Sequence, residues 1–385
     1  MRERLQKISV LFVLTALHKD GAVLSTLTTI KHLDRSRFYP RLFVLKAMQN
    51  TGDHPDAWTE LLQNMEVVFG FPEGEKAGLK YFQVFKTLYR LTKESDIVVG
   101  GLEMAPTFLS VLAGKLAGKP SAAFIRNSLP QLIASLPTYY KLLTRLFYPF
   151  LDKGIAISNG IKNSTESLFP KLRGRISTVY IPIDIQRIRR LAEKSTEAPL
   201  GPDKYLLAVG RLMPQKGFDV LLKAYAIAKK EGLTHKLVII GEGPERHTLE
   251  NFISTEGLTQ NVMLAGFQEN PYIWMKHADV FISSSRFEGF CRVLAEAQAL
   301  GTPVISTDCP EGPAEVLQGG ESGVLVETEN PEELSKAILS LLNDPEKIKE
   351  FRHKGLERVE QFTFINTVNK FGEILTELYQ SKNKS

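Results

Sequence analysis

The stretch 281–296, FISSSRFEGFCRVLAE, carries two carboxylates eight positions apart, Glu288 and Glu296. The apolar residues before it predict a buried strand and those after it a helix, which places Glu288 in the loop and Glu296 about one turn into the helix. Both would line one crevice at the carboxyl ends of parallel strands. Carboxylates accept hydrogen bonds from sugar hydroxyls, and free N–H groups at a helix start, here 289–294, bind phosphate oxygens. Such a crevice suits a sugar nucleotide, whereas the simpler alternative is a solvated pair of glutamates.

A second stretch, 210–217, reads GRLMPQKG and follows an apolar strand pattern at 206–209. Arg211 offers a planar guanidinium fork and Lys216 a point charge, and the two together can hold a diphosphate. Taken alone, this stretch is better explained as a solvated loop with two cations. The glutamate pair downstream favours the diphosphate interpretation.

The E-x7-E pattern within SSRFEGFCRVLAEAQALGTPVIS resembles the signature of the retaining glycosyltransferases of family 4, the glycosyl transferases group 1, which have the GT-B fold. The resemblance runs from Leu206 to about Phe371. It implies that Arg211 and Lys216 bind the donor diphosphate and stabilise it as it leaves, that Glu288 contacts donor sugar hydroxyls, and that Glu296 contacts the ribose. Together with Glu296, the expected donor-binding residues are Gly21, Gly210, Phe267, Gly289, Phe290, Cys291, Val293 and Leu294.

The first half of the chain departs from this family pattern in two places. Members often carry a glycine pair after the first strand, and here only Gly21 matches. Many also carry a histidine in a loop on the acceptor side, where this chain has Arg126 and Asn127. We expect these two side chains to contact the sugar instead, with His18 as an alternative polar group.

The elements that position these residues follow from the hydrophobic pattern. Short apolar strands alternate with helices in the first half, and the alternation restarts at Tyr205, which predicts two Rossmann-like domains in tandem. The resemblance adds that they face each other across a cleft and that a C-terminal helix, 362–379, crosses back to the first domain. We therefore place an acceptor-side domain at 1–183 with about 362–385, and a donor domain at 184–361. The strands expected in the first domain are 8–14, 41–45, 67–69, 96–100, 121–125, 154–158 and 179–184.

Composition excludes several classes of protein. The 385 residues are 43% hydrophobic and 24% charged, which is typical of a globular protein with ordinary cores. No stretch has the roughly 18 uninterrupted apolar residues of a membrane-spanning helix. Two cysteines, Cys291 and Cys309, and no signal-like start indicate a reducing, cytoplasmic setting. The seven histidines lack ligand spacing and no D-x-D occurs, so we expect neither a metal nor another cofactor.

Positive charge is concentrated in the first half. Residues 1–180 carry 24 Lys and Arg against 14 Asp and Glu, whereas the remainder carries 24 against 29. Two segments, 80–90 and 139–148, mix cations with aromatic residues. They are either core helices with solvated cations, or one of them rests on an anionic membrane face and presents a lipid-linked acceptor. We expect no nucleic-acid partner.

The sequence thus predicts a metal-independent, retaining glycosyltransferase, in which a sugar passes from a nucleoside diphosphate donor to a glycan or lipid-linked glycan. UDP-hexose or UDP-N-acetylhexosamine is the expected donor because UDP is the commonest nucleotide in the family. The loop 308–315, DCPEGPAE, resembles loops of members that act on bacterial surface polysaccharides, which favours that kind of pathway, at the inner face of the cell membrane. The alternatives are an epimerase or phosphorylase of similar fold, or a sugar-nucleotide-binding subunit without activity.

Overall fold

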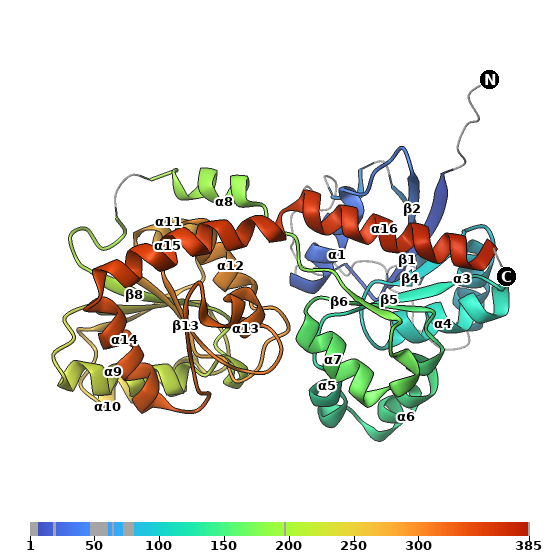
Figure 1. Cartoon of the computed structure of the whole chain (residues 1–385). Coiled ribbons are helices and arrows are strands. Elements are labelled where there is room, and N and C mark those ends of the chain that lie inside the picture. Colours follow the sequence, from blue (N-terminus) through green and yellow to red (C-terminus); the bar gives the residue numbers. More distant parts are fainter. Residues whose placement is uncertain are drawn as a thin grey trace. The chain divides into compact units, whose positions relative to one another are not determined.

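The computed structural model describes residues 7–17, 21–46, 61–63, 65–71, 81–195 and 198–383. These residues form two compact units, shown in Figure 1. Unit 1 contains the described residues up to Pro182 together with those from Phe364 onward, and unit 2 runs from Ile183 to Thr363. The boundaries expected from the sequence, 183/184 and about 361/362, lie one and two residues away from these positions.

Unit 1 is built on a parallel sheet whose described strands have the order β3-β2-β1-β4-β5-β6-β7. The strands are β1 (Ile8–Leu14), β2 (Phe38–Lys46), β3 (Glu66–Phe71), β4 (Ile97–Gly100), β5 (Ser121–Ile125), β6 (Lys153–Ala156) and β7 (Ile176–Thr178). The helices between them are α1 (Gly21–Lys31), α3 (Tyr81–Lys93), α4 (Ala105–Ala117), α5 (Leu129–Ser135), α6 (Thr138–Phe147) and α7 (Asn159–Leu168).

The central strand β1 shows why this sheet is covered on both faces. Its side chains alternate between two hydrophobic clusters, with Val10, Phe12 and Leu14 in one and Leu11 and Val13 in the other. All five are fully buried. A parallel strand that is buried on both sides reads as a continuous apolar run, and the sequence of β1 is of this kind.

The helix α16 (Phe364–Asn383) belongs to unit 1 although it follows the whole of unit 2 along the chain. Its buried side chains include Phe371, whose ring lies 6.2 Å from that of Phe12 and 5.2 Å from that of Phe124. Figure 1 shows this helix in red beside the blue strands of unit 1. The predicted return of a C-terminal helix to the first domain is therefore confirmed.

Unit 2 holds a second parallel sheet, with the strand order β10-β9-β8-β11-β12-β13. Its strands are β8 (Tyr205–Val209), β9 (Lys236–Ile240), β10 (Val262–Gly266), β11 (Val280–Ser283), β12 (Val304–Thr307) and β13 (Val324–Val326). Its helices are α8 (Ile185–Ala192), α9 (Phe218–Lys230), α10 (Arg246–Thr255), α11 (Tyr272–His277), α12 (Arg292–Ala299), α13 (Pro313–Val316), α14 (Pro331–Leu342) and α15 (Pro345–Val359).

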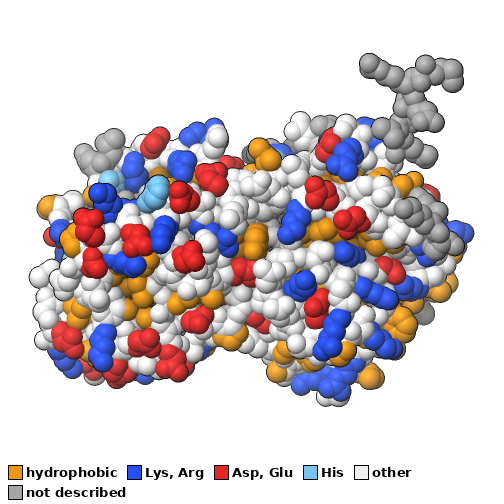
Figure 2. All heavy atoms as spheres, in the orientation of Figure 1, with side chains coloured by type: hydrophobic (Ala, Val, Ile, Leu, Met, Phe, Trp, Pro, Cys, Tyr) orange, Lys and Arg blue, Asp and Glu red, His pale blue; other side chains and the backbone are white. Residues whose placement is uncertain are grey.

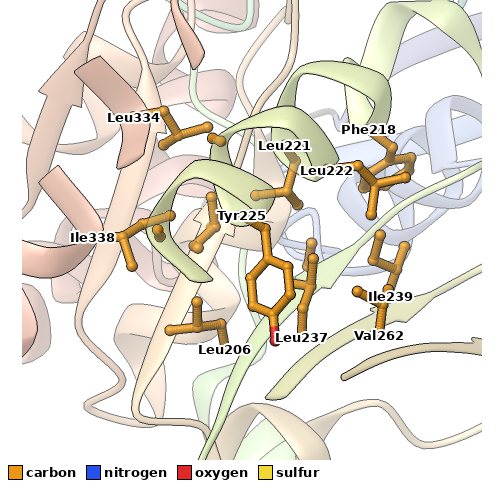
Figure 3. Packing of buried hydrophobic residues seen from close by; sticks show 14 of the residues in the cluster. Leu206, Phe218, Leu221, Leu222, Tyr225, Leu237, Ile239, Val262, Leu334 and Ile338 are labelled. Carbon is orange, nitrogen blue, oxygen red and sulfur yellow. The ribbon is translucent and has the colours of Figure 1, made fainter. Parts of the chain in front are cut away.

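Helix α9 carries much of the unit 2 core. Phe218, Leu221, Leu222 and Tyr225 are buried and recur at the three- and four-residue spacing of one helical face. Figure 3 shows this face directed towards Leu206 and Leu237 of the sheet and towards α14. The two predicted Rossmann-like α/β domains are confirmed by these two sheets.

Two sequence-based expectations differ from the structure. The segment 179–184 was expected to be the last strand of the first domain, but the strand is β7 at Ile176–Thr178. Pairing continues only to Val179, whose N–H donates to the Ala156 carbonyl. Pro182 has no N–H to donate to a neighbouring strand, so the chain leaves the sheet there. Helix α15 was not expected, because its sequence is largely polar and it buries only Phe351, Gly355 and Val359.

Candidate active site

The strand order of unit 2 brings two loops together at the carboxyl edge of its sheet. The chain passes from β8 to β9 and β10 on one side and then returns to β11 on the other side of β8. The loops that follow β8 and β11 therefore emerge next to each other, at the point where open α/β sheets bind ligands. They contain the predicted motif 210–217 and the loop part, 284–291, of the predicted motif 281–296.

An ion pair joins these loops. Lys216 Nζ donates to Glu288 Oε1 over 2.5 Å, and the Ser285 hydroxyl donates to the same oxygen over 2.7 Å. The Lys216 side chain is 21% exposed and that of Glu288 is 10% exposed. Two residues that are 72 positions apart in the sequence thus meet at the strand switch.

Backbone contacts fix the position of this pair. Lys216 closes a short 3-10 turn (Pro214–Lys216), and its carbonyl accepts from the Ser284 hydroxyl over 2.9 Å. The next residue, Gly217, has a φ of 60°, and a Cβ there would lie 2.1 Å from the Ser284 carbonyl oxygen. Only glycine allows so close an approach in the left-handed region. The aliphatic part of Lys216 lies beside Gly210, where an added Cβ would be 3.4 Å from its Cδ.

The charges around Lys216 keep its ammonium group protonated. Burial lowers the pKa of Lys216, but the opposing effects, of which the charge of Glu288 is the largest, together outweigh it, so the pKa lies above its ordinary value. The exposed guanidinium of Arg211 acts in the opposite direction, which places a second cation near the first. Burial, followed by the charge of Glu288, raises the pKa of the thiols of Cys291 and Cys309, in the latter case to about 12. Neither cysteine is thus a thiolate at neutral pH, and the local charge is carried by the cations and Glu288.

Arg286 braces the same loop. It donates to both carboxylate oxygens of Asp219 over 2.9 and 2.8 Å, and it also pairs with Glu329. These contacts tie the loop after β11 to the start of α9. The pattern of the sequence did not single out Arg286.

The second predicted carboxylate, Glu296, is held by a different group of side chains. It lies on α12, is buried, and accepts from Arg292 over 2.8 Å and from the Tyr272 hydroxyl over 3.4 Å. The charge of Glu296 raises the pKa of Arg292. Glu288 and Glu296 therefore start from one loop-to-helix junction but have separate partners.

The other expected donor-binding residues of unit 2 fall into two groups. Phe290, Cys291 and Leu294 are buried at the start of α12, and the Leu294 N–H donates to the Cys291 carbonyl, so it is engaged within the first turn. Gly289 and Val293 beside them are partly exposed. Phe267 follows the edge strand β10, so it lies on a different loop from Lys216 and Glu288, and it is 76% exposed.

Comparison with known proteins assigns the chain to a family. Residues 191–358, which include both motifs, match the model of the glycosyl transferases group 1. The chain is also 30% identical over 267 residues, 67% of its length, to the N-acetylgalactosamine-N,N'-diacetylbacillosaminyl-diphospho-undecaprenol 4-alpha-N-acetylgalactosaminyltransferase of Campylobacter jejuni, of which it covers 70%. The chain belongs to the glycosyl transferases group 1. It is thus a glycosyltransferase, as the sequence predicted.

Solved structures support the fold of this glycosyltransferase. The crystal structure of Anabaena HepE in complex with UDP superimposes with a TM-score of 0.80 at 19% identity, covering 96% of this chain and 100% of that one. The lipopolysaccharide outer core galactosyltransferase WaaB superimposes with a TM-score of 0.74 at 20% identity, covering 96% and 99%. These likenesses confirm the predicted GT-B fold class.

The residues of unit 1 expected to contact the donor, Gly21, or the acceptor, Arg126 and Asn127, lie near the strand switch of this unit, between β1 and β4. Gly21 is the exposed first residue of α1, with open space around it. Arg126, just after β5, is 6% exposed and donates to the hydroxyls of Ser25 and Thr26 over 2.8 Å each. The Arg126 guanidinium thus ties α1 to β5 instead of projecting into solvent. The alternative candidate His18 lies outside the described residues.

Asn127 is exposed and leads to a residue that the sequence did not single out, Glu103. One oxygen of Glu103 accepts from the N–H of Arg126 over 2.6 Å, from the N–H of Asn127 over 2.9 Å and from Asn127 Nδ2 over 3.2 Å. Glu103 lies just after β4, beside the strand switch. In the sequence, only its position after an apolar strand could have indicated a role for Glu103. Such a position alone does not predict a contact with the loop that contains Asn127.

A second such residue is Glu311, in the loop after β12. Its φ of 89° is unusual for a residue with a side chain. Its Oε2 is buried and has no hydrogen-bond partner among the residues that the structure describes. The next residue, Gly312, lies so close to the loop after β11 that a Cβ there would be 2.8 Å from the Phe290 carbonyl carbon. An acceptor oxygen without a partner beside the ion-paired loops is a candidate ligand contact.

Among the described residues, no group of three His, Cys, Asp or Glu side chains is arranged to hold a metal ion. The described cations near the strand switch of unit 2 include Lys216 and Arg211, on the loop after β8, and Arg286, which braces the loop after β11.

Proposed function

We propose that the protein is a retaining, metal-independent hexosyltransferase that uses a UDP-hexose or a UDP-N-acetylhexosamine as donor. The observation that carries this proposal is the Lys216–Glu288 ion pair at the strand switch of unit 2, with Arg211 beside it. Two cations on one loop match a diphosphate, and a fixed carboxylate matches sugar hydroxyls. UDP is the nucleotide bound in the HepE structure, which has the same fold.

The chemistry follows from where charge develops. As the bond between the anomeric carbon and the diphosphate breaks, negative charge grows on the departing oxygen, and the ammonium of Lys216 and the guanidinium of Arg211 stabilise it. Glu288 already holds the Lys216 ammonium at the strand switch, which supports its part in this step. The acceptor hydroxyl then attacks from the same face of the sugar, and its proton passes to the departing phosphate oxygen. This route needs no nucleophile from the protein.

The acceptor in this proposal is a glycan or a lipid-linked glycan of a bacterial surface polysaccharide, lipopolysaccharide or glycoconjugate. The Campylobacter relative is named for an acceptor linked to diphospho-undecaprenol. Another relative, 29% identical over 179 residues, is the poly(glycerol-phosphate) alpha-glucosyltransferase of Bacillus subtilis. One name describes a glycan linked to a lipid diphosphate and the other a phosphate-containing polymer, and we extend this class of acceptor to this chain.

We also propose that unit 1 rests on an anionic membrane surface at the cytoplasmic face. Helix α6 buries only Thr144, whereas Leu142 is 67% exposed and Leu146 is 53% exposed, next to Lys141 and Arg145. Figure 2 shows hydrophobic and basic side chains next to each other over the part of unit 1 where Figure 1 labels α6. A helix with exposed apolar residues and cations is suited to the headgroup region. No helix in the described ranges is long and apolar enough to span a membrane.

Donor hydrolysis tests the proposed activity. The protein is incubated with labelled UDP, GDP and ADP sugars without acceptor, and release of free sugar is measured with and without EDTA. We expect slow hydrolysis of a UDP sugar that EDTA leaves unchanged, and a rise in the melting temperature with the same nucleotide, because it binds only the folded state. Binding without release of sugar identifies a non-catalytic subunit. Conversion to another UDP sugar identifies an epimerase, and sugar release that depends on inorganic phosphate identifies a phosphorylase.

Two further measurements test the finer parts of the proposal. The anomeric configuration of the transferred sugar, read by NMR, is expected to match that of the donor, and inversion would contradict the retaining mechanism. Flotation with liposomes tests the membrane surface, with Leu142→Glu as the variant. We expect binding to anionic liposomes only, weakened in the variant, and equal binding to neutral liposomes would contradict the electrostatic contribution.

A further inference from the structure

Unit 1 contains a cavity of about 470 Å³ at the carboxyl edge of its sheet. It is lined by Thr15, which follows β1, by Lys46 at the end of β2 and by Phe71 at the end of β3. The helices α3, α4 and α6 form its walls. The volume lies in the range of about 300–1,000 Å³ that is typical of small-molecule sites.

Hydrocarbon dominates the walls of this cavity. Leu88 of α3, Phe108 and Leu109 of α4, and Leu143 and Phe147 of α6 all face it. The lining residues with polar side-chain atoms are Thr15, Lys46, Tyr81, Tyr139 and Tyr140. A sugar or a nucleotide placed there would exchange many hydrogen bonds to water for few partners, which costs free energy for every buried hydroxyl left unpaired. An apolar chain has no such cost and gains the favourable burial of its surface. The cavity therefore suits a hydrocarbon and not the sugar-bearing part of a substrate.

Charge at the rim indicates what such a chain is attached to. Lys46 lines the cavity and is itself exposed, so its ammonium is available to an anion at the mouth. Lys141 and Arg145 lie on α6, but each is two positions from Leu143 and therefore on the face of the helix opposite to the cavity wall. A hydrocarbon joined to a phosphate or diphosphate matches an apolar cavity with an exposed lysine, Lys46, among its lining residues. This combination is the chemistry of a lipid-linked glycan acceptor.

We propose that the cavity of unit 1 holds the part of the hydrocarbon chain that adjoins the phosphate of a lipid-linked acceptor. This inference rests on the proposed function and specifies its acceptor class. The exposed side chains of Leu142 and Leu146 on α6 lie next along the same helix, so a chain that leaves the cavity meets further apolar surface. The rest of the lipid then remains in the membrane while the sugar end stays at the carboxyl edge of the sheet.

Farnesyl diphosphate tests this assignment, because it is a short, soluble chain with a diphosphate, and inorganic diphosphate is the matched anion without a chain. Their affinities for the full-length protein are measured by calorimetry, together with that of UDP. Leu109→Trp fills the cavity, whereas Leu116→Trp places the same ring on α4 at a residue that is 58% exposed and does not line the cavity. If Leu109→Trp does not fold, Ala105→Leu serves as a smaller filling variant.

We expect farnesyl diphosphate to bind more tightly than inorganic diphosphate, and Leu109→Trp to weaken that binding by about tenfold or more, because the chain loses its burial. Leu116→Trp and the affinity for UDP should be unaffected. Equal affinities for the two diphosphates, or equal affinities of the two Trp variants for farnesyl diphosphate, would overturn the inference. Absence of UDP binding to the unmodified protein would instead overturn the proposed function, so the two failures are distinguishable.

Discussion

Replacing Lys216 by Met separates the structural role of the ion pair from its chemical role. The Nζ–Oε1 contact of 2.5 Å is largely shielded from water, since the two side chains are 21% and 10% exposed. Without the ammonium, the Glu288 carboxylate keeps only the Ser285 hydroxyl among its described partners. Removing one member of a fully buried pair costs about 3–5 kcal/mol, and we expect about 2–3 kcal/mol here because the pair is partly solvated.

The double variant Lys216→Met/Glu288→Gln completes the comparison. Removing both charges leaves no uncompensated carboxylate, so urea unfolding should show it to be more stable than Lys216→Met alone by about 1–2 kcal/mol. Its catalysis should not recover. Loss of one preorganised group that stabilises developing charge costs about 10²–10³ in kcat, and we expect a loss of that size in donor hydrolysis for the single and the double variant alike.

The control for this experiment is Lys223→Met, which removes an exposed lysine on α9. It should leave both stability and hydrolysis unchanged. The reasoning is refuted if Lys216→Met hydrolyses the donor as fast as Lys223→Met. It is also refuted if the double variant regains activity as it regains stability, since the pair would then be structural only.

Three further predictions follow from the same loops. Gly217→Ala should destabilise the protein and abolish UDP binding. Gly201 has the same φ of 60°, but nothing lies within 4 Å of a Cβ added there, so Gly201→Ala should cost only the strain of the left-handed backbone, about 1–2 kcal/mol. Thermal unfolding with and without UDP checks both variants. Glu311→Gly should stabilise the fold by up to about 1–3 kcal/mol, because glycine relieves the backbone strain at this position. The same variant should lower kcat/KM for the donor sugar. Full activity would show that Glu311 does not contact the substrate. Burial raises the pKa of Asp219, but the opposing causes, chiefly the hydrogen bonds and the charge of Arg286, together hold it below its usual 3.8. The stability from this pair is therefore complete above that pH and is lost as the pH falls through the lower folded pKa. In Asp219→Asn the unfolding free energy should fall less steeply below pH 4, and an unchanged slope would count against the pair.

The sequence was most informative where a short pattern has one physical meaning. Apolar runs such as β1 predict buried parallel strands, and cations or carboxylates just after such strands predict a site at the carboxyl edge. Lys216 and Glu288 could be placed together for this reason. Neither motif predicts the strand order that makes β8 and β11 neighbours. That order was implied only by the resemblance to a known fold.

Other contacts could not be predicted because they depend on tertiary packing. Glu311 reads as an ordinary loop residue, and its unusual φ arises where the next residue packs on the backbone of Phe290. Arg126 was expected at the acceptor, yet its charge is buried against the hydroxyls of α1, about a hundred positions earlier in the chain. Helix α15 lacks a strong apolar stripe, so it is stabilised by packing that the pattern does not reveal.

The path of the chain has a consequence for synthesis. Both ends of unit 2 are adjacent, since the N–H of Ile183 donates to the carbonyl of Phe362 over 2.7 Å. Unit 2 is thus an insertion with neighbouring termini, which is the kind of segment that folds as soon as it leaves the ribosome. The core of unit 1 can be completed only later, because Phe12 and Phe124 lack their partner Phe371 until the whole of unit 2 has been translated.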